Sequence, residues 1–285
     1  MSIFFNALEQ AERDRNWRRP PVSSPNPSPA PAAPAVERGG AAIADRPRPA
    51  ARPGEIDEHL VSLLEPASFA AEQYRALRHT VEQCRRAAGH TAFAIGSPCA
   101  ADGKTTTAIN LAGALAQARD ARVLLVEADL RCPRIAERLG LGGAAMPGLV
   151  QAIERRDLGL EDVTRFLEAY NLSVVLAGDG PAAPYELLES PRLGELLQQA
   201  RADYDYVILD TPPIVSFPDC RIIDSWVDGW LIVVAAHRTS RELLGEALDM
   251  MSPSKTLGFV FTHDERFRPN SRYYGGYYYA ARGRR

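Results

Sequence analysis

The chain has 285 residues, 46% of them hydrophobic and 24% charged, and its formal net charge is −3. This length and apolar content suit one large α/β domain with further segments attached. The slightly acidic balance excludes general nucleic-acid binding, and no apolar run approaches the ~18–20 residues needed to cross a bilayer.

The first 54 residues differ in composition from the rest. Residues 1–19 predict a short amphipathic helix, because Phe4, Leu8 and Ala11 recur at near-helical spacing. Residues 20–54 contain ten of the 22 prolines and predict a disordered, semi-extended linker that builds no core. A predicted helix followed by a long linker is typical of a peptide that docks on a partner. The alternative is that these residues are only a frayed terminus.

Residues 55–265 read as a globular domain, opened by a helix over 66–88. After it, strands are expected over 91–96, 122–127, 172–176, 205–209, 229–234 and 257–262. Helices are expected over 104–118, 134–139, 147–155, 185–202, 218–226 and 240–251. Continuous apolar strands are typical of a parallel sheet buried on both faces. We therefore expect an α/β fold, a doubly wound and mostly parallel sheet flanked by helices, with its ligand site at the carboxyl ends of the strands.

A phosphate-binding loop is predicted where the first of these strands meets a helix. The nucleotide-binding residues are expected to be Ala100, Ala101, Asp102, Gly103, Lys104, Thr105 and Thr106. Lys104 would neutralise terminal phosphate oxygens and Thr105 would bind Mg²⁺. The loop departs from the usual pattern, because Pro98 stands where a glycine is expected and Ala101 adopts positive φ poorly. Either the loop avoids that conformation at Ala101 or it is strained there.

Acidic residues follow two further strands. Glu127 and Asp129 come at the end of one apolar run, and Asp210 ends another. Because the ends of parallel strands share one rim, Asp210 and Asp129 are expected to bind Mg²⁺, and Glu127 or Asp129 to accept a proton. Arg131 could stabilise a transferring negative charge. Acids after strands can also cap helices or face water, but three such elements in order favour a nucleotide site.

The C-terminal tail, residues 266–285, contains arginines and tyrosines but no acidic residue. Its tyrosine cluster is formed by Tyr273, Tyr274, Tyr277, Tyr278 and Tyr279. Such a segment has no apolar pattern that could build a core, so we expect it to be flexible enough to enter another subunit's active site. A sticky aromatic tail is the alternative.

Over residues 60–285 these motifs resemble the bacterial tyrosine autokinases (BY-kinases) of capsule and exopolysaccharide export, a P-loop family with a partition-ATPase-like fold. Lys104 and Thr105 match the family's first motif. Glu127, Asp129 and Arg131 fall on the second, and Asp210 with its Thr-Pro-Pro on the third. Residues 178–188 resemble the family's Gly-x-x-Pro-x-x-Pro-x-Glu-Leu-Leu stretch. Glu72, Arg75 and Arg78 match its subunit-contact motif, Glu-x-x-Arg-x-x-Arg.

The resemblance implies an ATP- and Mg²⁺-dependent protein-tyrosine kinase that phosphorylates its own tyrosine cluster between neighbours in a homo-oligomeric ring. It also implies a separate membrane activator, a polysaccharide co-polymerase, which would hold a cytoplasmic protein at the inner membrane. Four cysteines without a close pair fit this reducing compartment, and the first 20 residues lack the apolar stretch of a signal peptide. The start Ser2-Ile3, followed by Ala7-Leu8-Glu9, resembles the exosortase-associated form.

Three departures from the family pattern keep other functions open. Ala100 and Ala101 replace Pro-Gly, Glu127 replaces an aspartate, and Thr262 stands where an asparagine can read adenine. A nucleotide-binding but non-catalytic regulator of polysaccharide chain length is therefore one alternative. A partition-type switch ATPase is another, disfavoured because Cys99 occupies the position of that class's second lysine.

Overall fold

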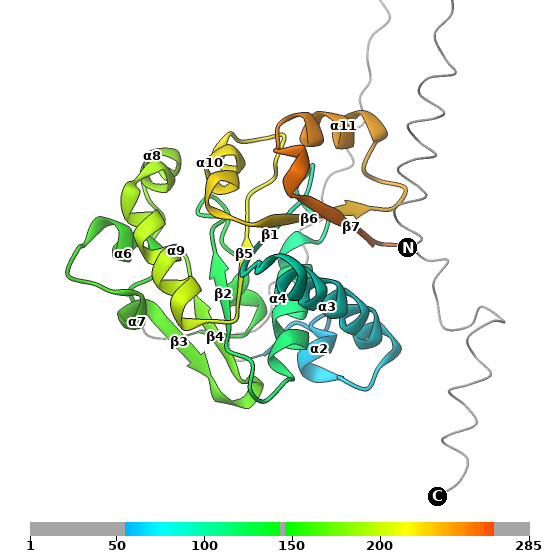
Figure 1. The fold of residues 1–285 in the computed structure, drawn as a ribbon, viewed down its shortest axis with the longest axis horizontal. Coiled ribbons are helices and arrows are strands. Elements are labelled where there is room, and N and C mark those ends of the chain that lie inside the picture. The colour runs from blue at the N-terminus through cyan, green and yellow to red at the C-terminus, as the bar shows by residue number, and fades with distance from the viewer. Residues whose placement is uncertain (1–54, 143–145, 265–285) are drawn as a thin grey trace, which may run out of the picture. The chain divides into compact units, whose positions relative to one another are not determined.

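One seven-stranded sheet, in the order β3-β4-β2-β5-β1-β6-β7, organises the computed structural model, which describes residues 55–142 and 146–264 (Figure 1). The strands are β1 (Ala92–Gly96), β2 (Val123–Glu127), β3 (Thr164–Leu167), β4 (Leu172–Val175), β5 (Tyr206–Asp210), β6 (Gly229–Ala235) and β7 (Thr256–Thr262). All neighbouring strands pair in parallel except β3, which runs antiparallel to β4 at the edge. The predicted α/β fold with a mostly parallel sheet is confirmed.

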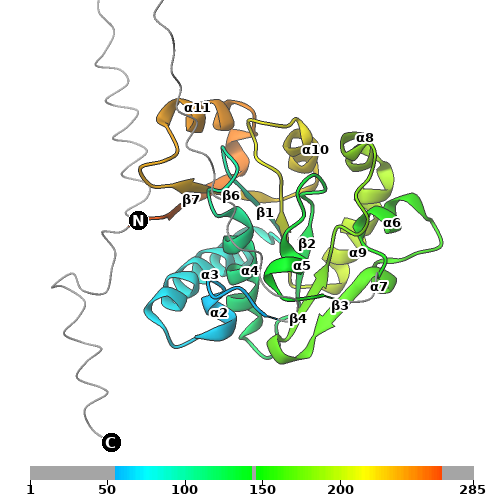
Figure 2. The ribbon, with the colours of Figure 1, turned by 180° about the vertical axis from the view of Figure 1, so that it is seen from behind.

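Helices follow the strands and cover both faces of the sheet (Figure 2). They are α2 (Val61–Leu64), α3 (Phe69–Ala88), α4 (Lys104–Ala116), α5 (Ile135–Arg138), α6 (Leu149–Glu154), α7 (Leu160–Val163), α8 (Pro184–Glu189), α9 (Pro191–Asp203), α10 (Asp219–Trp226) and α11 (Arg241–Asp249). Short 3₁₀ turns lie at Glu168–Tyr170 and Pro253–Lys255. Among the described residues, none of these helices has both the length and the apolar character that a membrane-crossing helix requires.

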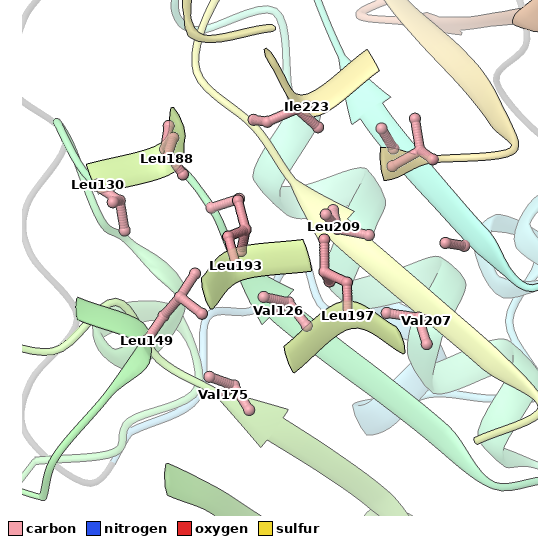
Figure 3. Close-up of a cluster of buried hydrophobic side chains, with 14 of the residues drawn as sticks. Val126, Leu130, Leu149, Val175, Leu188, Leu193, Leu197, Val207, Leu209 and Ile223 are labelled. Atoms are coloured by element: carbon pink, nitrogen blue, oxygen red, sulfur yellow. The ribbon is translucent and has the colours of Figure 1, made fainter. Parts of the chain in front are cut away.

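Alternating side chains of the strands divide the core into two clusters. On β2, Leu124 and Val126 join the cluster formed with α8, α9 and α10, whereas Val123 and Leu125 join the cluster with α4. Figure 3 shows Leu193 and Leu197 of α9 over the first of these surfaces. Because both faces are covered, the open part of the sheet is its rim, where the strands end.

Helix α3 begins and ends on local signals that the sequence carries. The Ser68 hydroxyl accepts a hydrogen bond from the Ala71 amide at the N-terminus, and Gly89 ends the helix with φ of 71°. A buried Asn110 side chain on α4 accepts from the Ser62 amide and donates to the His59 carbonyl. These contacts fasten the start of the domain to the helix that follows the phosphate loop.

The structure corrects the helix predicted over 185–202. It consists of two helices, because Ser190 and Pro191 end α8 and begin α9, with the Ser190 hydroxyl accepting from the Arg192 amide. The sequence pattern also missed α2, α7 and β3. Strand β3 is a half-exposed edge that begins with the polar residues Thr164 and Arg165, so it lacks the continuous apolar run that marked the inner strands.

Candidate nucleotide-binding site

Three strand ends meet behind the loop that precedes α4. In the pairing register, Asp210 at the end of β5 lies opposite Ile95 of β1 on one side and Glu127 of β2 on the other. The Ala128 amide donates to the Asp210 carbonyl over 2.8 Å, which continues the pairing beyond the strands. The predicted convergence of the acidic strand ends at one rim is therefore present in the fold.

The loop itself resolves the alternative left open at Ala101. Ala101 has φ of 63° and Gly103 has φ of 98°, so both adopt left-handed conformations. Glycine adopts this region freely, but an alanine is strained there by about 1–2 kcal/mol. Ala100 and Ala101 are exposed, while Asp102 and Thr105 are buried and Thr106 is half-buried.

Lys104 opens α4 and points to the acidic strand ends. Its Nζ lies 3.0 Å from Asp129 Oδ2, and its side chain is only 11% exposed. Burial alone would lower the pKa of Lys104, but the Asp210 and Asp129 carboxylates more than offset it and raise that pKa. Lys104 therefore stays protonated and provides a fixed positive charge at the N-terminus of a helix.

Asp210 is buried, and neither of its carboxylate oxygens has a hydrogen-bond partner among the described residues. Burial raises its pKa to about 7, against the lowering effects of Lys104 and the Thr105 hydroxyl. An orphaned buried carboxylate next to a hydroxyl and a second carboxylate suits a hard cation. No cluster of three or more His, Cys, Asp or Glu side chains that could bind a metal alone occurs among the described residues. Mg²⁺ at nucleotide sites takes its remaining ligands from phosphates and water, so Thr105, Asp129 and Asp210 fit it.

Glu127 lies at the same rim but has a different environment. Its Oε1 accepts from the amides of Arg134 and Ile135, each over 2.6 Å, and its Oε2 accepts from the Ala177 amide over 3.0 Å. Burial raises the pKa of Glu127, although these contacts act to lower it. Both oxygens are thus engaged in joining β2 to the start of α5 and to the end of β4. This geometry favours a positioning residue over the proton acceptor that the sequence left open for Glu127.

Arg131 is held by two residues that sequence reasoning missed. Its Nε and Nη2 donate to the two oxygens of Asp219 over 2.7 and 2.9 Å, and its guanidinium lies 4.4 Å from the ring centroid of Phe217. Asp219 is fully buried at the first position of α10. In the sequence, Asp219 could be noticed as an acid at the start of a predicted helix. Its partner Arg131 lies 88 residues away, and no spacing in the sequence reveals the pair.

The Asp102 side chain is buried against the protein. Its Oδ2 accepts from the Cys99 amide over 3.1 Å, and its Oδ1 accepts from the Thr239 hydroxyl over 3.0 Å. The Thr262 hydroxyl donates to its carbonyl oxygen over 2.6 Å. Thr262, expected near an adenine, thus contacts the loop backbone directly.

The predicted subunit-contact residues lie on α3 and make contacts within the chain. Arg75 pairs with Glu72 and donates to the Pro66 carbonyl. Arg78 pairs with Glu82 over 2.6 Å and donates to the Ala114 carbonyl of α4 over 2.9 Å. The five tail tyrosines, the N-terminal helix and the linker lie outside the described residues.

Comparison with known proteins adds the family. A family model described as an AAA domain matches residues 99–242. The chain is 32% identical over 229 residues to the tyrosine-protein kinase YwqD of Bacillus subtilis (strain 168), which covers 80% of this chain and 94% of that protein. It is also 32% identical over 200 residues to the tyrosine-protein kinase ptk of Acinetobacter johnsonii, covering 70% of this chain but only 27% of that longer protein.

A solved structure agrees with these sequence matches. The kinase domain of Escherichia coli tyrosine kinase ETK superposes with a TM-score of 0.66 at 25% identity, over 71% of this chain and 79% of that one. The chain therefore belongs to the bacterial tyrosine autokinases, whose members are protein-tyrosine kinases built on a P-loop nucleotide-binding domain.

Proposed function

We propose that the chain is an ATP-dependent protein-tyrosine autokinase that phosphorylates its C-terminal tyrosine cluster and thereby regulates exopolysaccharide polymerisation and export. The observation that supports this most is the group of buried charges behind the phosphate loop. Lys104 pairs with Asp129, and Asp210 lies beside them without a hydrogen-bond partner among the described residues. Similarity to named tyrosine-protein kinases over most of the chain supports the phosphoryl acceptor.

Binding of ATP would use the start of α4. Amides of residues 100–106 would cradle the phosphates at a helix N-terminus, and Lys104 would neutralise the terminal phosphate. Thr105 and Asp210 would hold Mg²⁺, which neutralises phosphate charge when it is bound. The raised pKa of Asp210 fits this role, because a carboxylate that is costly to ionise alone is stabilised by a nearby cation.

Transfer to tyrosine needs a group that accepts the hydroxyl proton, because a tyrosine hydroxyl has a pKa near 10. We assign this role to Asp129 and not to Glu127, whose two oxygens bind three backbone amides. Asp129 Oδ1 accepts from the Cys132 amide over 3.0 Å, but among the described residues its Oδ2 faces only the Lys104 ammonium. Arg131, oriented by Asp219 and Phe217, would stabilise negative charge on the transferring group. When ATP binds, its phosphates would take over the contact with Lys104. Asp129 would then be free to contact the tyrosine hydroxyl.

The acceptors we propose are Tyr273, Tyr274, Tyr277, Tyr278 and Tyr279 of a neighbouring subunit. A ring of copies would bring tail and site together, with Glu72, Arg75 and Arg78 at the contact between subunits. A separate membrane activator would hold the cytoplasmic ring at the inner membrane, with residues 1–19 as its docking helix. Phosphates on several tyrosines would add up to about two negative charges each, which the acidic site repels, and the ring would then separate.

A pair of lysines makes the first test sharp, because Lys104 and Lys255 are the only lysines in the sequence. Lys104→Met should abolish phosphate on the tryptic peptide 273–282 of protein expressed in bacteria, as measured by tandem mass spectrometry. Lys255→Met is the matched control, because Lys255 directly precedes β7, away from the loop, and contacts the Asp224 carbonyl of α10. Equal phosphate in the two variants would contradict the site assignment.

Nucleotide binding can be measured separately. Calorimetry with Mg²⁺-ATP should show binding by the parent and by Lys255→Met, and much weaker binding by Lys104→Met. One observation favours a second candidate, the non-catalytic nucleotide-binding regulator: Asp129 and Arg131 are both engaged in ion pairs within the chain. Mg²⁺-ATP binding by the parent without tail phosphate, even with the membrane partner present, would establish that second function.

A further inference from the structure

Asp102 lies in the predicted phosphate loop, yet only 4% of it is exposed. One carboxylate oxygen accepts from the Cys99 amide within the loop, and the other accepts from the Thr239 hydroxyl. Its carbonyl accepts from the Thr262 hydroxyl over 2.6 Å. All three contacts are made with other residues of the protein, so they stabilise the conformation of the loop.

The two threonines belong to the ends of neighbouring strands. The Thr239 hydroxyl also accepts from the amide of Ala235, the last residue of β6, over 3.0 Å. Thr262 is the last residue of β7, and its carbonyl accepts from the Ala236 amide over 2.8 Å. A Cβ added at Gly103 would come within 3.3 Å of Thr262 Cγ2, so Thr262 packs closely on the loop. Asp102 thus connects the loop after β1 to the ends of β6 and β7.

The residue before Asp102 explains why such a connection is needed. Ala101 has φ of 63°, a conformation that glycine adopts freely and alanine does not. Strain of this kind persists only where the surrounding structure holds the residue in place. The contacts of Asp102 are adjacent to the strained peptide and tie it to its own loop, to the turn after β6 and to the end of β7, so they can hold it.

We propose that Asp102, Thr239 and Thr262 form a brace that holds the phosphate loop in its nucleotide-binding shape and replaces the conformational freedom of a glycine at position 101. The Asp102 carboxylate is then a positioning group that touches no substrate atom, because both of its oxygens accept from the protein. The inference rests on the proposed nucleotide binding, because the brace acts through the loop amides that would face the phosphates.

The test is a cycle of variants in the full-length protein, with the dissociation constant for Mg²⁺-ATP measured by calorimetry. Asp102→Ala should weaken binding by about tenfold or more, as expected for loss of two hydrogen bonds to a carboxylate. Ala101→Gly alone should bind Mg²⁺-ATP no more weakly than the parent does, because glycine relieves the strain of the positive φ at this position. The double variant Ala101→Gly with Asp102→Ala should recover most of the loss, because a glycine does not need the brace. A general structural role for Asp102 predicts no such recovery.

Thr239 provides a second pair in case Asp102→Ala fails to fold. Thr239→Val removes the hydroxyl at constant shape and should weaken binding several-fold, whereas Thr239→Ser keeps the hydroxyl and should bind as the parent does. Parental affinity in Asp102→Ala or Thr239→Val, or additive losses in the double variant, would overturn the brace alone. Failure of the parent protein to bind ATP would overturn the proposed function and the brace together.

Discussion

At the scale of single residues, Asp210 and Asp228 are two buried or half-buried aspartates with opposite electrostatics. Asp210 has no hydrogen-bond partner among the described residues, and burial raises its pKa to about 7. Burial also acts on Asp228, but its contacts with Arg201 and with the amides of Thr91 and Ala92 outweigh it and lower its pKa. The Asp210 carboxylate therefore suits a positively charged ligand, whereas the Asp228 carboxylate is stabilised by partners within the fold.

This contrast predicts opposite effects on stability when each aspartate becomes asparagine. Between the unfolded pKa near 4 and the folded pKa of about 7, native Asp210 keeps a proton that the unfolded chain has lost, so stability falls as pH rises through that window. Asp210→Asn should remove this loss. We expect it to raise the melting temperature of the protein without Mg²⁺ at pH 8, by about 2–4 °C for each kcal/mol, and to change it little near pH 4.

Asp228→Asn is the control with the reverse sign. Its lowered pKa contributes stability that is present above the unfolded pKa and lost as pH falls, so the substitution should lower the melting temperature most at neutral pH. Thermal unfolding between pH 4 and 8 measures both variants. A lower melting temperature for Asp210→Asn at pH 8 would show that its carboxylate is already paired in the protein.

Glu127 gives a second prediction at this scale. Aspartate is one methylene shorter and cannot reach the amides of Arg134, Ile135 and Ala177 together. Glu127→Asp should therefore lower the free energy of unfolding by about 1–3 kcal/mol, as expected for a buried polar group left unpaired. Denaturant unfolding measures this, with Glu137→Asp on α5 as a more exposed control. Unchanged stability together with lost phosphate transfer would instead return the proton-acceptor role to Glu127.

At the scale of helices and strands, the parallel strands could be predicted because each is a continuous apolar run, as in Val123–Val126. The break between α8 and α9 was also readable in principle, since Ser190 followed by Pro191 is a helix start signal. It was missed because apolar periodicity continues across it. Strand β3 could not be found in this way, because its edge position leaves Phe166 exposed and its pattern mixed.

In the candidate site, too, some residues could be predicted from local sequence and others could not. Lys104, Asp129 and Asp210 were predictable because each lies at or near the end of a strand or opens a helix, and parallel strand ends share a rim. Asp219, Thr239 and Thr262 come from distant elements, and only tertiary packing brings them to Arg131 and Asp102. Local spacing carries no information about such pairs.

Helix α3 allows its structural and proposed subunit-contact roles to be separated. Arg78 donates to the Ala114 carbonyl near the end of α4, so Arg78→Ala should lower the free energy of unfolding by about 1–2 kcal/mol. Glu72 pairs with Arg75 at a half-exposed position, so Glu72→Ala should cost at most about 1 kcal/mol. Denaturant unfolding with light scattering measures stability and mass together. The proposed ring requires Glu72→Ala to lose mass without losing stability, and an unchanged mass would argue against this contact.

At the scale of the whole molecule, the proposed function requires that site and acceptor belong to different copies. Lys104→Met has an intact tail but no lysine at the phosphates, whereas deletion of residues 266–285 leaves the described site and removes the acceptors. Each variant alone should carry no phosphotyrosine in the tail. Mixed in the presence of Mg²⁺-ATP, they should produce phosphate on the Lys104→Met tail, measured on peptide 273–282. A control mixture with Lys104→Met in both chains should remain unmodified. If only the parent chain is phosphorylated and the mixture is not, transfer occurs within one copy, and the ring is not needed to bring tail and site together.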